Sequence, residues 1–409
     1  LNDRRLAAFL NDTDPLVRTE AARAIHDLPL DDLLPQLAAQ LPKLVASPIP
    51  DADPLARRAI NANYRVGGSE NAKAVLAAVT SPVLSTAVRA EALGALRDWT
   101  SPPPRDRVTG FWRAEKPREP LVVRGVVEDG LETLLTGTSG KLQADAVGLI
   151  VAVGARADEA RFVALADDAK ADPNLRVAAM RFLAGRKSKQ AETVLTSALK
   201  STSPLVRAEA RDLIAKADPA RGIPLLDEVL ADDKAATRER QRAIAAVAAT
   251  KTPAAGRVLD AWTYRLAAGE VPVDLQVDVL EALKATPSPV RDRLRLKFED
   301  ALPKDPVGKF QVSLTGGDAE AGREVFFNHT AAQCMRCHTV KGVGGTAGPD
   351  LSQVATRNPT RTREHILESL VLPSAKIAAG FGTVTLTLVD GRVLGGTLVS
   401  EDKSTLVVQ

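Results

Sequence analysis

A short phrase that recurs along the first three quarters of the chain constrains its fold more than any other feature. Asp or Ser is followed by Pro, a mainly apolar pair, Arg and an alanine-rich stretch, and copies begin at Asp14, Asp53, Asp172 and Ser203. The arginines are 31 residues apart from Arg176 to Arg207 and on to Arg238, and 32 apart from Arg57 to Arg89. A fixed period in this range predicts a solenoid of stacked units.

Each phrase has the chemistry of a helix start. Asp or Ser is expected to cap the second helix of a hairpin, and Pro fits the first turn because no backbone donor is needed there. Small residues such as Ala21, Ala22 and Ala24 allow neighbouring helices to approach closely. The pattern resembles HEAT repeats in about eight or nine copies. We therefore predict a mostly α chain with a HEAT-type α-solenoid over residues 1–310.

The repeats are interrupted between residues 100 and 120. The run 101–104 is Ser-Pro-Pro-Pro, which is not compatible with a helix, and Phe111 and Trp112 follow Gly110. The insertion is either a docking loop for another domain or a segment folded back over the edge of the repeats. We favour the second interpretation because single exposed aromatic side chains are common.

Composition and charge exclude several classes of protein. Hydrophobic residues make up 45% and charged residues 26% of the 409 residues, which is typical of a soluble globular chain. The net charge is +3, and residues 317–409 hold nine basic and nine acidic residues, so nothing indicates nucleic-acid binding. No apolar run approaches the roughly 18 residues of a transmembrane helix. The chain starts with Leu1 and no signal peptide is visible, so we expect a piece of a longer protein.

A second domain is predicted over residues 317–409, after a boundary at 304–308. The expected elements are a helix over 318–327, a glycine-rich loop at 342–348, a helix over 360–371, and strands within 383–409 that start with a hairpin around Asp390-Gly391. The strands are predicted from a period of two, in which Val384, Leu386 and Leu388 alternate with threonines.

The two cysteines of the chain lie in one pentapeptide, Cys334-Met335-Arg336-Cys337-His338. This pattern indicates covalent attachment of haem c. Two thiols one helical turn apart can each bond a haem vinyl group, and the adjacent histidine can then bind the iron. A zinc site and a redox-active thiol pair are the alternatives. Zinc usually needs four ligands, and a redox pair expects a βαβ setting that is missing here.

The residues around the pentapeptide resemble those of class I c-type cytochromes. Gly322 and Phe326 precede it with helical spacing, and Gly348-Pro349-Asp350-Leu351 follows it. The resemblance implies a small cytochrome c-like domain in which the Pro349 carbonyl accepts a hydrogen bond from His338 and Leu351 packs on the porphyrin. Such a bond would fix the tautomer and orientation of an iron-binding histidine.

The whole arrangement resembles one family more closely. After the repeats come Gly322, Phe326-Phe327, the pentapeptide, Gly348 to Leu351, Glu364 to Ser369, Pro373-Ser374 and an Asp390-Gly391-Arg392 hairpin. This is similar to the planctomycete-type haem-binding domain at the C-terminus of large dehydrogenase-like proteins that are secreted or membrane-associated. The resemblance covers essentially the whole chain, but it is specific only in the last 90 or so residues. In that family a β-propeller often precedes the repeats, and none is present in this sequence.

The sixth iron ligand is not evident. Met335 lies inside the attachment loop and Met180 in the repeats, and no methionine follows the pentapeptide. In the resembling family the ligand lies beyond the hairpin, so we expect the chain to be truncated before it. Within the chain the candidates are His365, His329 and Lys376. An open position would allow peroxidase-like chemistry instead.

These observations predict an electron-transfer module with one haem c, rather than a catalyst in its own right. The expected donor is a dehydrogenase domain or protein, and the expected acceptor is another cytochrome. Because thioether attachment normally occurs outside the cytoplasm, we expect a periplasmic or otherwise extracytoplasmic location. The alternative from another class is a peptide-binding HEAT scaffold with a vestigial haem site.

Overall fold

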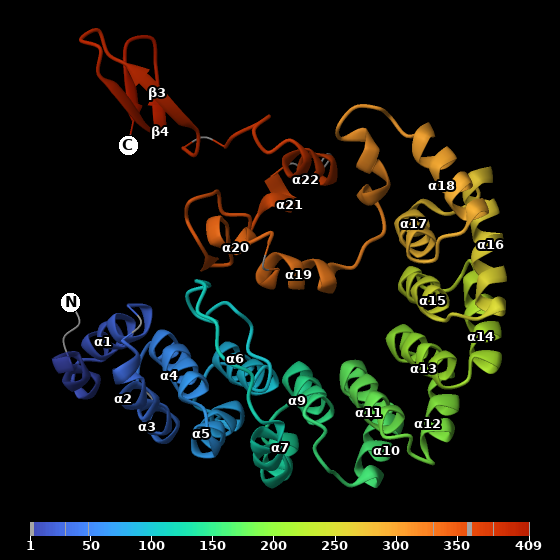
Figure 1. The fold of residues 1–409 in the computed structure, drawn as a ribbon, viewed down its shortest axis with the longest axis horizontal. Helices are drawn as coiled ribbons and strands as arrows, with labels where there is room; N and C mark the ends of the chain where they lie inside the picture. Colours follow the sequence, from blue (N-terminus) through green and yellow to red (C-terminus); the bar gives the residue numbers. More distant parts are fainter. Residues whose placement is uncertain are drawn as a thin grey trace. The chain divides into compact units, whose positions relative to one another are not determined.

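The computed structural model describes residues 4–28, 30–47, 49–329, 331–357, 362–378 and 380–408, without the side chain of Asn328. The chain divides into two compact units, residues 1–218 and 219–409 (Figure 1). The division falls within the repeats, and the predicted boundary at 304–308 lies inside the second unit. Among the described residues, no helix is long and apolar enough to cross a membrane.

The first unit is entirely helical in its regular structure. Its helices are η1 (Arg4–Asn11), α1 (Pro15–Asp27), η2 (Asp31–Leu33), α2 (Leu34–Ala38), α3 (Gln40–Ala46), α4 (Asp53–Val66), α5 (Ser69–Thr80), α6 (Thr86–Arg97), α7 (Pro120–Asp129), α8 (Leu131–Thr136), α9 (Gly140–Ala152), α10 (Glu159–Asp167), α11 (Pro173–Gly185), α12 (Ala191–Ala198) and α13 (Pro204–Ala217). The helices α1, α4, α6, α9, α11 and α13 contact one another in that order and form one layer. This is the stacking expected of a solenoid.

Buried alanines allow the helices of this layer to pack closely. Ala56 and Ala59 of α4 and Ala92 and Ala95 of α6 are fully buried. A methyl side chain fills little space, so the helix backbones can approach closely. The prediction that small residues line the contacts is therefore confirmed.

The predicted caps are present in some repeats and missing in others. Asp14 and Asp172 each accept a hydrogen bond from the amide two residues later, at 2.8 Å. Ser203 precedes α13 without a side-chain cap bond. Asp53 lies inside the first turn of α4 and accepts a hydrogen bond from the Ser85 hydroxyl at 2.7 Å. The prediction that Asp or Ser caps every copy was wrong for these two, whereas Pro occupies the first turn in all four.

One arginine of the phrase, Arg176, makes a contact that Arg89 and Arg240 share and that the spacing alone did not reveal. Arg89, Arg176 and Arg240 each donate to the carbonyl ten residues earlier, near the end of the preceding helix, at 2.8, 2.9 and 3.2 Å. The third equivalent residue is therefore Arg240 and not Arg238. The prediction that Arg238 continues the period of 31 was wrong, because α15 starts 33 residues after α13, whereas α13 starts 31 residues after α11.

The second unit begins with the remaining repeats. Its helices there are α14 (Pro219–Ala231), α15 (Thr237–Ala249), α16 (Pro253–Ala268), η3 (Val273–Leu275), α17 (Gln276–Ala285) and α18 (Pro289–Ala301). As in the first unit, two layers form: α15 contacts α17, and α16 contacts both α14 and α18.

The segment after the repeats has short helices and strands. They are η4 (Gly308–Leu314), α19 (Ala319–Asn328), α20 (Cys334–Cys337), β1 (Thr339–Val340), β2 (Val343–Gly344), α21 (Val354–Arg357), α22 (Thr362–Val371), β3 (Thr383–Thr387), β4 (Val393–Glu401) and β5 (Leu406–Val408). The predicted helices over 318–327 and 360–371 are present as α19 and α22, although residues 360 and 361 lie outside the described residues. No described residue after Leu283 is buried.

The predicted strands form one antiparallel sheet in the order β3-β4-β5. Thr383 pairs with Thr397, and Thr387 pairs with Val393. Val384 and Leu386 are half-buried while the threonines between them are exposed, which confirms the period of two. The hairpin turns at Gly391, whose φ of 85° favours glycine. The last predicted strand residue, Gln409, lies outside the described residues.

Helix α19 is joined to the repeats by a short polar contact. Its cap residue Asp318 accepts hydrogen bonds from the amides of Glu320 and Ala321 at 2.9 and 3.0 Å. The same carboxylate lies 2.6 Å from the Arg238 guanidinium of α15. These bonds and the Arg238 charge lower the pKa of Asp318, against the opposing effect of burial. The start of the helix is thus fixed to the solenoid within the second unit.

Candidate functional site

The pentapeptide forms a single helical turn. Gln333 precedes it in the left-handed region at φ 48°, and the His338 amide donates to the Cys334 carbonyl at 2.9 Å. Both thiols are free, with Cys334 half-buried and Cys337 exposed. The helical turn places the two sulfur-bearing residues on one side of a short element, as the spacing predicted.

A glycine-rich loop wraps around this turn. The amides of Gly345 and Gly348 donate to the carbonyls of Met335 and Cys337 at 2.8 and 2.7 Å. A Cβ added at Gly345 would lie 2.0 Å from the Arg336 carbonyl oxygen. Such a contact is impossible without moving the backbone, so the glycine is needed for the loop to approach the pentapeptide.

The loop also fixes the histidine. His338 Nδ1 lies 2.9 Å from the Pro349 carbonyl oxygen. A carbonyl can only accept, so Nδ1 carries the proton and Nε2 presents its lone pair. A Cβ at Gly348 would lie 2.9 Å from Cε1 and 3.0 Å from Nδ1 of the ring. The hydrogen bond expected from the resemblance is therefore present.

The remaining predicted residues lie nearby. The Leu351 amide donates to the Thr339 carbonyl at 2.9 Å, which ties the Pro349-to-Leu351 segment to the residue after His338. The Leu351 side chain is half-buried. Phe326 and Phe327 are half-buried in α19, with ring centroids 5.2 Å apart, and Arg323 lies over Phe327 at 4.4 Å.

Each candidate for a sixth ligand has another partner or is exposed. Lys376 Nζ lies 2.7 Å from the Glu368 carboxylate. His329 Nδ1 accepts hydrogen bonds from the amides of Ala331 and Ala332 at 3.3 and 3.1 Å. His365 is exposed on α22. None of the three is brought to His338 by a contact between the described residues.

Two features of the segment fit a large apolar prosthetic group. The described residues after Leu283 include no buried side chain, although Val325, Leu370 and Ile377 are apolar and between 48% and 72% exposed. A porphyrin supplies the apolar surface that such side chains could cover. The donor set also fits, since two thiols and an imidazole with a free Nε2 are those of haem c attachment. In the described part of the chain, no three His, Cys, Asp or Glu side chains cluster as a metal site.

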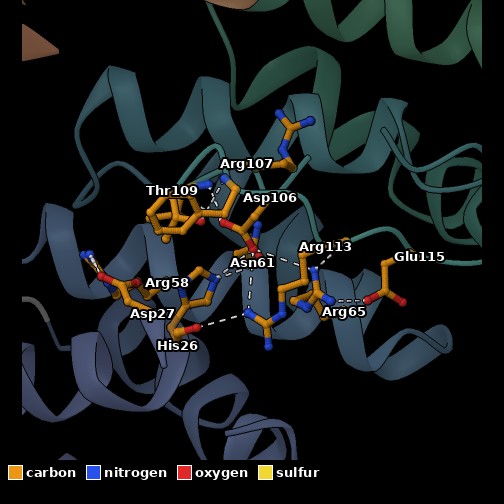
Figure 2. A network of polar contacts seen from close by, with 12 residues as sticks. His26, Asp27, Arg58, Asn61, Arg65, Asp106, Arg107, Thr109, Arg113 and Glu115 are labelled. Carbon is orange, nitrogen blue, oxygen red and sulfur yellow. Dashed lines mark hydrogen bonds and ion pairs between the residues drawn. The ribbon is translucent and has the colours of Figure 1, made fainter. Parts of the chain in front are cut away.

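A second polar cluster lies in the first unit, where the insertion folds back over the repeats (Figure 2). The insertion loop, residues 98–119, links α6 to α7. Its residue Asp106 is buried, and one carboxylate oxygen accepts hydrogen bonds from the amides of Val108 and Thr109 at 2.9 Å. The other oxygen faces His26 Nε2, Arg65 and Arg113 at 3.4, 3.6 and 3.8 Å. The interpretation that the insertion folds onto its own array is thus confirmed.

The cluster shifts the pKa values of its two central groups, His26 and Asp106. Burial by itself would lower the pKa of His26, but hydrogen bonding and charge from Asp106, with further bonds to Asp27 and Asn61, raise it overall. Burial would likewise raise the pKa of Asp106, yet His26 and the two loop amides hold it below its usual range. The pair is therefore stabilised in its charged form.

Sequence reasoning did not identify this cluster. His26 and Asp106 are 80 positions apart, and neither belongs to a motif. The proline run indicated only that a loop is present, and Phe111 and Trp112 indicated only its exposed tip. Phe111 is 64% and Trp112 is 71% exposed.

Comparison with known proteins supports the repeat region. Residues 159–260 match the HEAT repeats family. A solved structure, the complex of CpcE and CpcF of phycocyanin lyase from Nostoc sp. PCC7120, shares 15% identity with a TM-score of 0.28. That likeness covers 72% of this chain and 92% of the other. No curated protein matches the sequence. Residues 159–260, which hold successive pairs of helices, are therefore similar to HEAT repeats.

Proposed function

We propose that residues 334–338 attach one haem c covalently and that the chain is an electron carrier on a HEAT-repeat scaffold. The bond of His338 Nδ1 to the Pro349 carbonyl is the observation that carries this proposal. It leaves Nε2 able to bind a metal, in the same pentapeptide as two free thiols one helical turn apart.

Each residue has a defined part in the proposal. The Cys334 and Cys337 thiols would each add across one vinyl group, the sulfur bonding one carbon and the thiol hydrogen passing to the other, so no oxidant is consumed. His338 would bind iron through Nε2, and the Pro349 carbonyl would raise the basicity of the imidazole. Leu351 would cover porphyrin surface. The haem, when bound, supplies reversible one-electron exchange.

The proposal also gives the partners and the location. The donor would be a dehydrogenase domain or protein and the acceptor another cytochrome, so this chain would serve an oxidoreductase without catalysing the reaction itself. The location would be periplasmic or otherwise extracytoplasmic, because c-type haem is normally attached there.

The test is expression of the chain with a haem c maturation system. We expect a Soret band and a pyridine haemochrome spectrum of haem c that persist after acid-acetone extraction. The double variant Cys334→Ala/Cys337→Ala should lose all covalent haem. His338→Ala should keep covalent haem and lose the native axial ligation.

Ser369→Ala is a matched control, because this hydroxyl donates only to the His365 carbonyl of its own helix. It should leave the spectrum unchanged. A colourless wild-type protein would refute the cytochrome proposal, and an unchanged low-spin spectrum in His338→Ala would refute the ligand assignment.

The same spectra address the sixth ligand. A low-spin spectrum lost in His365→Ala or Lys376→Ala would identify that residue as the ligand. Lys376 must first leave Glu368, so we expect the smaller effect there at neutral pH. A high-spin wild-type spectrum would support an open position and the peroxidase-like alternative.

A peptide-binding scaffold with a vestigial haem site is the second candidate. It is favoured by the HEAT repeats at 159–260 and by the exposed tip of the insertion loop at Phe111 and Trp112. Solenoids commonly present extended surfaces to protein partners. Failure of covalent attachment under maturation conditions, with the repeats folded, would favour this candidate.

A further inference from the structure

The side chain of His26 is held where only its protonated form satisfies its neighbours. It is fully buried at the end of α1, with Nδ1 2.8 Å from Asp27 Oδ1. Nε2 lies 3.1 Å from Asn61 Oδ1 and 3.4 Å from Asp106 Oδ2. Both ring nitrogens therefore face acceptors. A neutral imidazole has one N–H and can donate in one direction only, whereas the imidazolium donates in both.

The protonation of His26 also affects the insertion loop, because the buried loop residue Asp106 faces this histidine. Among the described residues, Asp106 Oδ2 has no well-aligned hydrogen bond and faces the charges of His26, Arg65 and Arg113. His26 is the nearest of the three. When it loses its proton, a buried carboxylate keeps only the two more distant guanidiniums, and an undercompensated buried charge is costly.

The other charged groups of the cluster come from every element around His26. Asp27 of α1 bonds Arg58 of α4 at 2.7 Å, and Arg65 of α4 bonds Glu115 of the loop at 2.5 Å. Arg113 of the loop bonds Asp31 of η2 and donates to the His26 carbonyl at 3.0 Å. Carboxylates and guanidiniums stay ionised near neutral pH. His26 is therefore the member of this cluster that changes charge between about pH 5 and 8.

We propose that His26 is a pH-dependent latch: its protonated form holds the insertion loop closed over α1 and α4, and its deprotonation at rising pH releases the loop. The loop carries Phe111 and Trp112 at its exposed tip. The latch thus controls whether these two aromatic side chains are presented in a fixed geometry or on an open segment.

The sign follows from linkage. The pKa of His26 is raised in the closed loop, so its contribution is fully present below the ordinary value of 6.5 and is lost as the pH rises through the raised value. The pKa of Asp106 is lowered, so its contribution is present above its ordinary value of 3.8. The closed loop is therefore most stable in mildly acidic solution.

Hydrogen exchange of the full-length chain between pH 5.5 and 9 tests the latch. The amides of Asp106, Gly110, Arg113 and Arg118 each donate to a loop carbonyl, at 2.8 to 3.0 Å. After correction for the intrinsic pH dependence of exchange, we expect their protection to fall above pH 6.5 by up to about tenfold per pH unit until the raised pKa is passed. Protection in the buried turns of α4 and α6 should stay constant.

Two variants and a control complete the test. Asp106→Asn and His26→Gln should each lower loop protection and remove its dependence on pH in this range. Asp300→Asn removes a carboxylate of the same type from an exposed pair with Lys304 and should behave as the wild type. In histidine NMR, the signal missing from His26→Gln should titrate above 6.5 in the wild type and lower in Asp106→Asn. Loop protection independent of pH in the wild type, or a His26 that titrates below 6.5, would overturn the proposal.

Discussion

At the scale of single residues, two histidines show how the groups facing an imidazole decide its chemistry. His338 has one nitrogen on the Pro349 carbonyl, so its other nitrogen keeps a lone pair for a metal. His26 has acceptors at both nitrogens, so its charged form with a proton on each nitrogen is favoured. The sequence contains a motif for the first. It contained no signal for the second, because Asp106 reaches His26 only after the insertion loop has folded.

Gly348→Ala is the residue-scale prediction. The new Cβ would lie 2.9 Å from Cε1 and 3.0 Å from Nδ1 of His338, closer than side-chain carbons pack. The ring must therefore shift and weaken its bond to Pro349. Nitrogen NMR of the haem-free chain should show His338 losing its preference for the Nδ1–H tautomer.

Gly382→Ala is the matched control, since its nearest neighbour would be the Ile377 side chain at 3.8 Å. It should leave the His338 signal unchanged. An unaltered tautomer in Gly348→Ala would show that the glycine is not needed to position the ring.

At the scale of elements, the repeated arginine joins one helix to the end of the preceding one. Arg176 of α11 is buried, and it donates to the Ala166 carbonyl at 2.9 Å and to the Ser201 hydroxyl at 3.1 Å. A guanidinium at the C-terminal end of a helix satisfies a free carbonyl and complements the helix dipole. The sequence period included Arg89 and Arg176, but the carbonyls that they bind became clear only from packing.

Arg176→Met is the element-scale prediction. Methionine retains most of the apolar stem but removes both hydrogen bonds, so we expect local opening at the end of α10 to become easier by about 1–3 kcal/mol. Hydrogen exchange of the amides near Ala166 measures this. In the control variant Arg97→Met, the altered side chain is 61% exposed. The free energy of local opening at the end of α10 should then change by less than about 1 kcal/mol, the value of an exposed ion pair. Equal effects of both variants would contradict the role of Arg176.

At the scale of the whole molecule, burial is distributed unevenly along the chain. The described core runs from Leu10 to Leu283, and no described residue beyond it is buried. Hydrophobic burial is the main favourable contribution to folding, so the repeats and the segment after them differ in intrinsic stability. In the proposed cytochrome, the prosthetic group would supply the missing apolar contact.

We predict that haem attachment protects the amides around the pentapeptide selectively against hydrogen exchange. Amides of residues 319–351 should exchange at least tenfold more slowly in the matured protein than in Cys334→Ala/Cys337→Ala, because covalent haem stabilises only the folded segment. Amides of α4 and α11 should be unchanged and serve as the internal control. Similar exchange of 319–351 in both proteins would mean that these residues do not fold around the group.

The sequence by itself determined the solenoid class, the helices and strands of the last part and the Cys-x-x-Cys-His motif, because these depend on local patterns: a repeat period, helix-start residues, strand alternation and a fixed Cys-Cys-His spacing. Only the tertiary structure decided that the glycine loop encloses the pentapeptide, that Arg240 and not Arg238 continues the repeat, and that Asp106 is buried against His26. These depend on contacts between distant residues and on the spacing between successive helix starts. Local sequence does not determine which distant groups come into contact. Packing and the need to compensate buried charge determine this.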